Sequence, residues 1–224
     1  MKALKSYFYP VRLHDYERSD LFPNHFNNEI AGDRISTIGF ENRFRENAQE
    51  SVEVYLEVVF WKLYSQKRIR QGGTSRIVDY VLGNSIEPKR LYKAIRRFVE
   101  VPQKQNLQNI RDSLGIRTNV LAIALTFPAF LAPEKYPMVD NNVARWVNAH
   151  HAEHNRHRQA RLTPFYLGYT SLRDNDFSNY IDWVHWCNEM AQILSERTGV
   201  IWRPRDVEMA VFTAERKNLE LNIL

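Results

Sequence analysis

Hydrophobic residues recur at helical spacing along most of the 224-residue chain. The clearest case follows Pro88, where Leu91, Ile95 and Phe98 stand at positions i, i+4 and i+7. Residues at this spacing share one face of a helix. The other positions of the segment are rich in basic residues, which are Lys89, Arg90, Lys93, Arg96 and Arg97. The pattern predicts a helix with one face in the core and a basic surface around the remainder.

Similar apolar sets, together with helix start and stop signals, predict most of the other helices. Asn47 and Glu50 have the spacing of a capping box, and the dense apolar residues after them predict a helix that is buried on most sides and ends at Gly72 and Gly73. Further helices are predicted around residues 74–82, 107–114, 119–127, 140–147, 177–198 and 204–211. Strand-like alternation is nearly absent, so the sequence predicts an all-α protein of about eight helices.

The chain has no internal repeat and no linker rich in Gly or Ser, so it gives no reason to expect independent domains. Residues 1–46 carry scattered aromatic residues without a clear period, and we expect them to form an arm that packs on the core. Residues 47–224 are expected to form the helical domain. Pro128, Pro133 and Pro137 predict an extended or turned segment ahead of a helix that begins near Asp140.

Composition limits the classes of protein to which the chain can belong. A hydrophobic fraction of 44% can fill a core, whereas the longest apolar run, residues 120–127, is too short for the roughly 20 residues of a membrane-spanning helix. Because a secretory signal is also missing, we expect a cytoplasmic, nucleoid-associated protein. Cys187 is the only cysteine, which excludes an internal disulfide and a four-cysteine metal centre. Its apolar neighbours predict a buried, inert thiol, and they are Trp183, Trp186 and Met190.

The net charge of +5 is concentrated in one part of the chain. Residues 85–120 hold eight basic residues against three acidic ones, a local excess equal to the charge of the whole protein. The basic residues are Lys89, Arg90, Lys93, Arg96, Arg97, Lys104, Arg111 and Arg117. A basic cluster of this kind is typical of proteins that bind a polyanion, and we expect it to contact the phosphates of duplex DNA.

Two short motifs carry the functional information. The first is the run Leu114-Gly115-Ile116-Arg117-Thr118-Asn119, and the second contains Val139, Asp140, Val143 and Arg145 in the pattern Val-Asp-x-x-Val-x-Arg. Together they resemble the helix–hairpin–helix DNA glycosylase superfamily, over about residues 50–215. The resemblance implies an all-α fold of two closely packed helical lobes that binds duplex DNA and removes a damaged or mispaired base.

The resemblance also implies roles for individual residues. The hairpin of Gly115, Ile116, Arg117 and Thr118 would hold the phosphate backbone, although Arg117 stands where the family has a second glycine. The carboxylate of Asp140 would stabilise positive charge on the sugar as the base leaves. Arg145 is expected to contact DNA, and Gln66 would fill the gap left by the extruded base. The segment from Thr198 to Val207 resembles the start of the last helix in archaeal oxoguanine glycosylases.

Asn119 stands at the position where bifunctional members of the superfamily carry a lysine that attacks the sugar. An amide cannot form a Schiff base, so we expect a monofunctional enzyme that uses water. Lys67 and Lys135 remain open as substitutes for the lysine.

Three other interpretations remain open. Gly115 and Asp140 also suit an ordinary helix end and an ordinary N-cap. The absent lysine and the missing second glycine are compatible with a non-enzymatic DNA-binding relative. His150, His154 and His157 would share one helical face and could hold a metal, but no matching carboxylate or Cys is visible, and a solvated or phosphate-facing helix is favoured. We expect no metal, no cofactor and a monomeric protein.

Overall fold

A computed structural model of the chain describes residues 2–9, 32–64, 86–114, 121–156, 159–165, 174–219 and 221. Within these ranges the regular structure is helical, and the only β feature is an isolated antiparallel bridge between Phe8 and Asp33. The all-α prediction is therefore confirmed. None of the described helices is long and apolar enough to cross a membrane.

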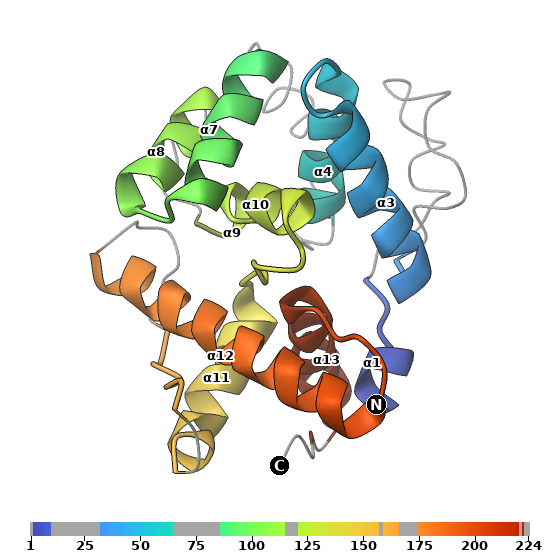
Figure 1. The fold of residues 1–224 in the computed structure, drawn as a ribbon, viewed down its shortest axis with the longest axis vertical. Coiled ribbons are helices and arrows are strands. Elements are labelled where there is room, and N and C mark those ends of the chain that lie inside the picture. Colours follow the sequence, from blue (N-terminus) through green and yellow to red (C-terminus); the bar gives the residue numbers. More distant parts are fainter. Residues whose placement is uncertain are drawn as a thin grey trace. The chain divides into compact units, whose positions relative to one another are not determined.

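The chain divides into two compact units, residues 8–117 and residues 1–7 with 118–224. The first unit contains α3 (Arg34–Asn47), α4 (Val52–Tyr64), α7 (Pro88–Glu100) and α8 (Lys104–Ser113) (Figure 1). The second contains α1 (Lys2–Lys5), α9 (Leu121–Ala124), α10 (Thr126–Leu131), α11 (Asn141–His154), α12 (Asp174–Thr198) and α13 (Pro204–Lys217) (Figure 1). The expected division into an arm of residues 1–46 and a domain of residues 47–224 stays a prediction.

Aromatic residues and two amphipathic helices form the core of the first unit. Phe44 of α3 meets Tyr55 of α4 edge to face, with ring centroids 5.3 Å apart, and Tyr9 stacks on Trp61 at 4.0 Å. Helices α7 and α8 pack against each other. The predicted stripe of α7 is confirmed, because Leu91, Ile95 and Phe98 are fully buried, and so are Leu107 and Ile110 of α8.

The predicted capping box at Asn47 is wrong. Asn47 is the last residue of α3, and its side-chain Nδ2 donates a hydrogen bond back to the carbonyl oxygen of Arg43 at 2.8 Å. Helix α4 begins at Val52, where the hydroxyl of Ser51 accepts a hydrogen bond from the backbone N–H of Glu53 at 3.1 Å. A short polar side chain thus satisfies an unpaired N–H at the start of α4, but it lies four residues further along than expected.

Helix α13 is the centre of the second unit. Its residues from Pro204 to Ala214 are all buried, and α1, α11 and α12 each pack against it. The N-terminal residues belong to this unit, since Tyr7 packs edge to face on Phe212 and the Lys217 ammonium donates to the carbonyl oxygen of Ser6 at 2.8 Å.

The expectation that Pro128 lies in an extended or turned segment is wrong. Pro128 is the third residue of α10 and is buried there. A proline is tolerated in a first turn because the N–H groups of that turn have no partner inside the helix. The segment with Pro133 and Pro137 does lack helix, as predicted, and leads to α11.

Candidate active site

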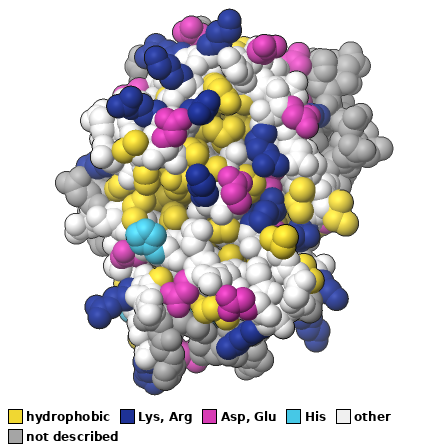
Figure 2. Space-filling view, viewed as in Figure 1, with side chains coloured by type: hydrophobic (Ala, Val, Ile, Leu, Met, Phe, Trp, Pro, Cys, Tyr) yellow, Lys and Arg dark blue, Asp and Glu magenta, His cyan; other side chains and the backbone are white. Residues whose placement is uncertain are grey.

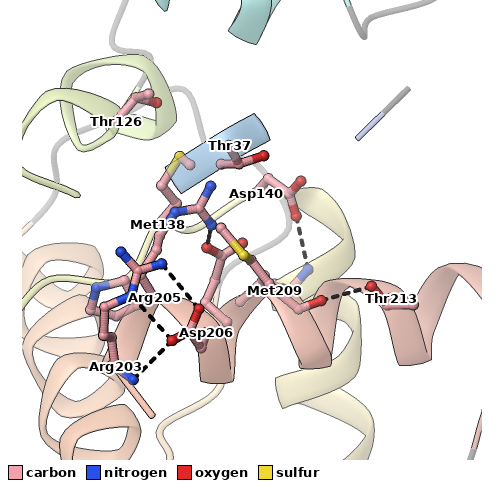
Figure 3. Close-up of polar contacts among 12 residues, drawn as sticks. Thr37, Thr126, Met138, Asp140, Arg203, Arg205, Asp206, Met209 and Thr213 are labelled. Carbon is pink, nitrogen blue, oxygen red and sulfur yellow. Dashed lines mark hydrogen bonds and ion pairs between the residues drawn. The ribbon is translucent and has the colours of Figure 1, made fainter. Parts of the chain in front are cut away.

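Asp140 is the N-cap of α11. It has an extended backbone (φ −144°, ψ −175°), and its carboxylate Oδ1 accepts hydrogen bonds from the backbone N–H groups of Asn142 and Val143 at 2.8 and 2.9 Å. Figure 3 shows Asp140 at the start of this helix. These two bonds satisfy donors that a helix start otherwise leaves unpaired, and the positive end of the helix dipole favours the negative charge.

The second carboxylate oxygen of Asp140 has no hydrogen-bond partner among the described residues, and no described cation forms an ion pair with this carboxylate. The side chain is partly buried and follows two buried apolar residues, Met138 and Val139. No described cation therefore offsets the charge of this carboxylate when it is ionised. The ionised carboxylate can stabilise a positive charge that develops close to it, or accept a proton from water.

The segment before Asp140 is held by side chains of α12. The hydroxyl of Tyr180 donates to the carbonyl oxygen of Pro137 at 3.1 Å, and the indole Nε1 of Trp183 donates to that of Met138 at 2.9 Å. Asn188 donates in the same way to the carbonyl oxygen of Lys135 at 3.0 Å. Tyr180 and Trp183 are fully buried, so these bonds fix the backbone that leads to Asp140.

Burial raises the pKa of Tyr180 well above its ordinary value of 10.0, and the nearby Tyr136 and Cys187 add to the shift. The phenol is therefore neutral and able to donate at any physiological pH. Sequence reasoning missed this set of donors. The sequence signal for these donors was the placement of Tyr180 and Trp183 in a buried helix, because the polar atom of a buried Tyr or Trp usually needs a hydrogen-bond partner.

Two ion pairs lie at the start of α13, one of them formed by its N-cap residue Arg203. The guanidinium of Arg203 binds Asp206 with both carboxylate oxygens engaged, from Nε at 3.1 Å and from Nη2 at 3.0 Å (Figure 3). Arg205 pairs with Glu208, and both side chains are at least 95% buried. The backbone N–H of Arg205 also donates to the carbonyl oxygen of Pro133 at 3.3 Å, which ties the start of α13 to the segment that ends at Asp140.

Arg145, the second predicted site residue of α11, is exposed and forms contacts within the protein. Its Nε donates to Glu215 of α13 at 3.0 Å, and its Nη2 donates to the side-chain oxygen of Asn142. The side chain retains 52% exposure, so these contacts leave one side of the guanidinium open to solvent. Arg145 links α11 to α13, and its expected contact with DNA stays a prediction.

The other predicted site residues lie outside the described residues. These are Gln66, Gly115, Ile116, Arg117, Thr118 and Asn119, together with the possible nucleophile Lys67. The predicted hairpin falls on the connection between α8, which ends at Ser113, and α9, which begins at Leu121. Lys135, the other possible nucleophile, is described and exposed.

His150 and His154 of α11 belong to an aromatic cluster with Trp146 and Trp186. His154 is buried, and its ring lies 5.0 Å from that of Trp146 and 5.5 Å from that of Trp186. The expected solvated or phosphate-facing position is therefore wrong for His154, because the cluster excludes water from it. His157 lies outside the described residues. Within the described part of the chain, no three metal-ligating side chains converge, and the expectation of no metal and no cofactor stays a prediction.

Cys187 is fully buried, as predicted, and burial raises the pKa of its thiol well above 9.0. A neutral, buried thiol is a poor nucleophile. Four tryptophans are also core residues in the described structure, namely Trp61, Trp146, Trp183 and Trp202.

Comparison of the chain with protein-family models, with curated proteins and with solved structures finds no significant match. The assignment of a function therefore rests on the residues and their geometry.

Proposed function

We propose that this protein is a monofunctional DNA glycosylase of the helix–hairpin–helix class, which hydrolyses the N-glycosidic bond of a damaged or mispaired base in duplex DNA. The observation that carries the proposal is the carboxylate of Asp140. One of its oxygens is fixed by two backbone N–H groups at 2.8 and 2.9 Å, and the other has no hydrogen-bond partner among the described residues.

In the proposed reaction, the bond between C1′ of the deoxyribose and the base nitrogen breaks, and its electron pair leaves with the base. The Asp140 carboxylate stabilises the transition state, in which positive charge develops on the sugar, more than it stabilises the neutral substrate. This difference lowers the activation barrier. A water oxygen then forms the new bond to C1′, and Oδ2 of Asp140 accepts its proton. Asn119 has no part in this chemistry, since an amide cannot form an imine.

The rigid support of Asp140 is consistent with this role. A charged group stabilises a transition state best when it is already in position. A group that must move or lose its hydration shell during the reaction costs free energy, and this cost offsets much of the stabilisation. The bonds from Tyr180 and Trp183 to the preceding carbonyl oxygens hold the position of Asp140 from a second helix.

The test is base release from a panel of lesion-containing and mispaired duplexes, followed by alkali treatment. The proposal expects release of one class of base, an intact strand that breaks only after alkali, and no protein–DNA adduct on borohydride reduction. A trapped adduct would contradict the monofunctional mechanism and identify a lysine nucleophile, with Lys135→Ala and Lys67→Ala as the first variants to test.

The second candidate is a DNA-binding protein of the same class without catalytic activity. The observation in its favour is that Asp140 already has a structural role as an N-cap, which requires no chemistry. Binding of duplex DNA without release of any base in the panel would support this candidate over the enzyme.

A further inference from the structure

Helix α7 divides sharply into a buried apolar side and an exposed basic side. Leu91, Ile95 and Phe98 are fully buried, whereas all five of its basic residues are exposed, namely Lys89, Arg90, Lys93, Arg96 and Arg97. At about 100° per residue, the cations fall within an arc of about 120° and the buried residues within an arc of about 60° on the opposite side. In the space-filling view, Lys and Arg side chains lie over α7 and α8, with some Asp and Glu side chains among them (Figure 2).

Few of the described acidic residues balance this surface. Arg96 pairs with Glu100 at 2.8 Å, and none of the other four cations forms an ion pair with a described residue. The first turn of α7 contains no acidic residue, and Glu87 at the N-cap position makes no side-chain cap hydrogen bond. An ordinary solvated helix face carries charges of both signs, so this face differs from the usual case.

The arrangement also opposes the stability of the helix itself. Lys89 and Arg90 lie in the first turn, where the positive end of the helix dipole disfavours a cation. Lys89, Lys93 and Arg97 follow each other at spacings of four residues, and like charges at this spacing repel. Because the apolar side of α7 is buried, a partner would meet mainly the charges of its exposed face. A bound polyanion would reduce the repulsion among these like charges.

We propose that the exposed face of α7 is a second phosphate-contact surface for duplex DNA, additional to the hairpin. The inference rests on the proposed function for its partner. From Lys89 to Arg97 the helix rises about 12 Å, which matches the axial length of three to four phosphates on one strand at about 3.4 Å each. Contacts of this kind position the duplex without reading its sequence.

The test uses the full chain and an undamaged duplex, and measures affinity against salt concentration. The variant is Lys89→Gln/Lys93→Gln, and the matched control is Lys5→Gln/Arg45→Gln, which removes the same charge at two exposed positions outside α7. Loss of two phosphate contacts should lower affinity on the order of tenfold or more at about 0.1 M salt and reduce the log–log salt slope by about 1.8. The control should keep the wild-type slope.

Thermal unfolding gives an independent readout. Because the α7 charges repel one another, the α7 variant should unfold at the same or a higher temperature than the wild type, although it binds DNA more weakly. A wild-type affinity and slope in the α7 variant, an equal loss in the control, or a lowered unfolding temperature of the α7 variant would each overturn the inference. Tighter binding of an RNA duplex than of a DNA duplex would overturn the choice of partner.

The failure of this inference can be told apart from failure of the proposed function. Base release by both the wild type and the α7 variant, with equal DNA affinity, would overturn the role of α7 alone. Salt-dependent binding through α7 without release of any base would overturn the glycosylase proposal and leave the surface in place.

Discussion

The indole Nε1 of Trp183 donates a hydrogen bond of 2.9 Å to the carbonyl oxygen of Met138, two residues before Asp140. The bond joins residues that are 45 positions apart in the sequence, and the Trp183 side chain is fully buried. It links α12, the longest described helix, to the segment that places the candidate catalytic carboxylate. The stability of the second unit and the position of Asp140 therefore depend on the same contact.

Replacing Trp183 with Phe should lower the free energy of unfolding by removing this hydrogen bond and leaving a buried carbonyl oxygen without its donor, at a cost of about 1–3 kcal/mol beyond the loss of indole volume. Chemical denaturation at equilibrium measures this cost. Base release, where it occurs, should also slow, because the position of Asp140 is less tightly fixed.

Trp186→Phe is the matched control for Trp183→Phe. Trp186 is equally buried in the same helix, but its Nε1 has no hydrogen-bond partner within the described structure. The substitution removes the same indole volume without breaking a hydrogen bond, so it should cost less. Equal losses of stability in the two variants would show that the bond to Met138 contributes little.

The second unit should lose stability at alkaline pH. Burial raises the pKa of both Cys187 and Tyr180, so these groups stay protonated in the folded state at pH values at which they ionise in the unfolded chain. Their contribution is fully present below the unfolded pKa values, near 9.0 and 10.0, and is lost as the pH rises above them. Each group adds a slope of about 1.4 kcal/mol per pH unit in its range.

Unfolding by denaturant at pH 7 to 11 measures this slope. Tyr180→Phe lacks the phenol, so its free energy of unfolding should fall less steeply above about pH 10 than that of the wild type. At pH 7 the variant should be less stable than the wild type, because it lacks the hydrogen bond to the carbonyl oxygen of Pro137. An unchanged slope in this variant would mean that Tyr180 is not protected from ionisation by burial.

The buried pair of Arg205 and Glu208 should respond differently to single and double substitution. Arg205→Met leaves the Glu208 carboxylate buried without its partner, which typically costs about 3–5 kcal/mol. Arg205→Met/Glu208→Leu removes both charges and should recover part of that loss. A double variant that is less stable than Arg205→Met alone would show that Glu208 is held mainly by contacts other than Arg205.

Helix α7, whose apolar period is regular, could be predicted from the sequence, and helix α3, whose apolar period is interrupted, could not. In α7 all three core positions are apolar, and each was predicted. In α3 the buried positions are Thr37, Phe40, Glu41 and Phe44, so two polar residues interrupt the apolar period and the helix was missed. Burial of Thr37 and Glu41 depends on tertiary contacts that local sequence does not record.

The candidate site also has one part that could be predicted from the local sequence and another part that could not. Asp140 could be predicted because a short acidic residue after a proline-containing segment is a local signal for an N-cap. Its support could not, because nothing in the sequence pairs Trp183 with one particular carbonyl oxygen among many. The hairpin residues Gly115 to Asn119 lie outside the described structure, and their roles stay predictions.

The most direct test of the proposed function is the single-turnover rate of base release by Asp140→Asn on the duplex that the wild type cleaves best. Asn caps a helix about as well as Asp, so the fold and the affinity for DNA should be retained while the negative charge is lost. The control is Asp33→Asn, since Asp33 is also an N-cap aspartate, accepting from the Ser36 N–H at 2.8 Å. We predict a rate at least about 100-fold lower for Asp140→Asn and a wild-type rate for Asp33→Asn. Base release by Asp140→Asn at the wild-type rate would contradict the catalytic role of Asp140.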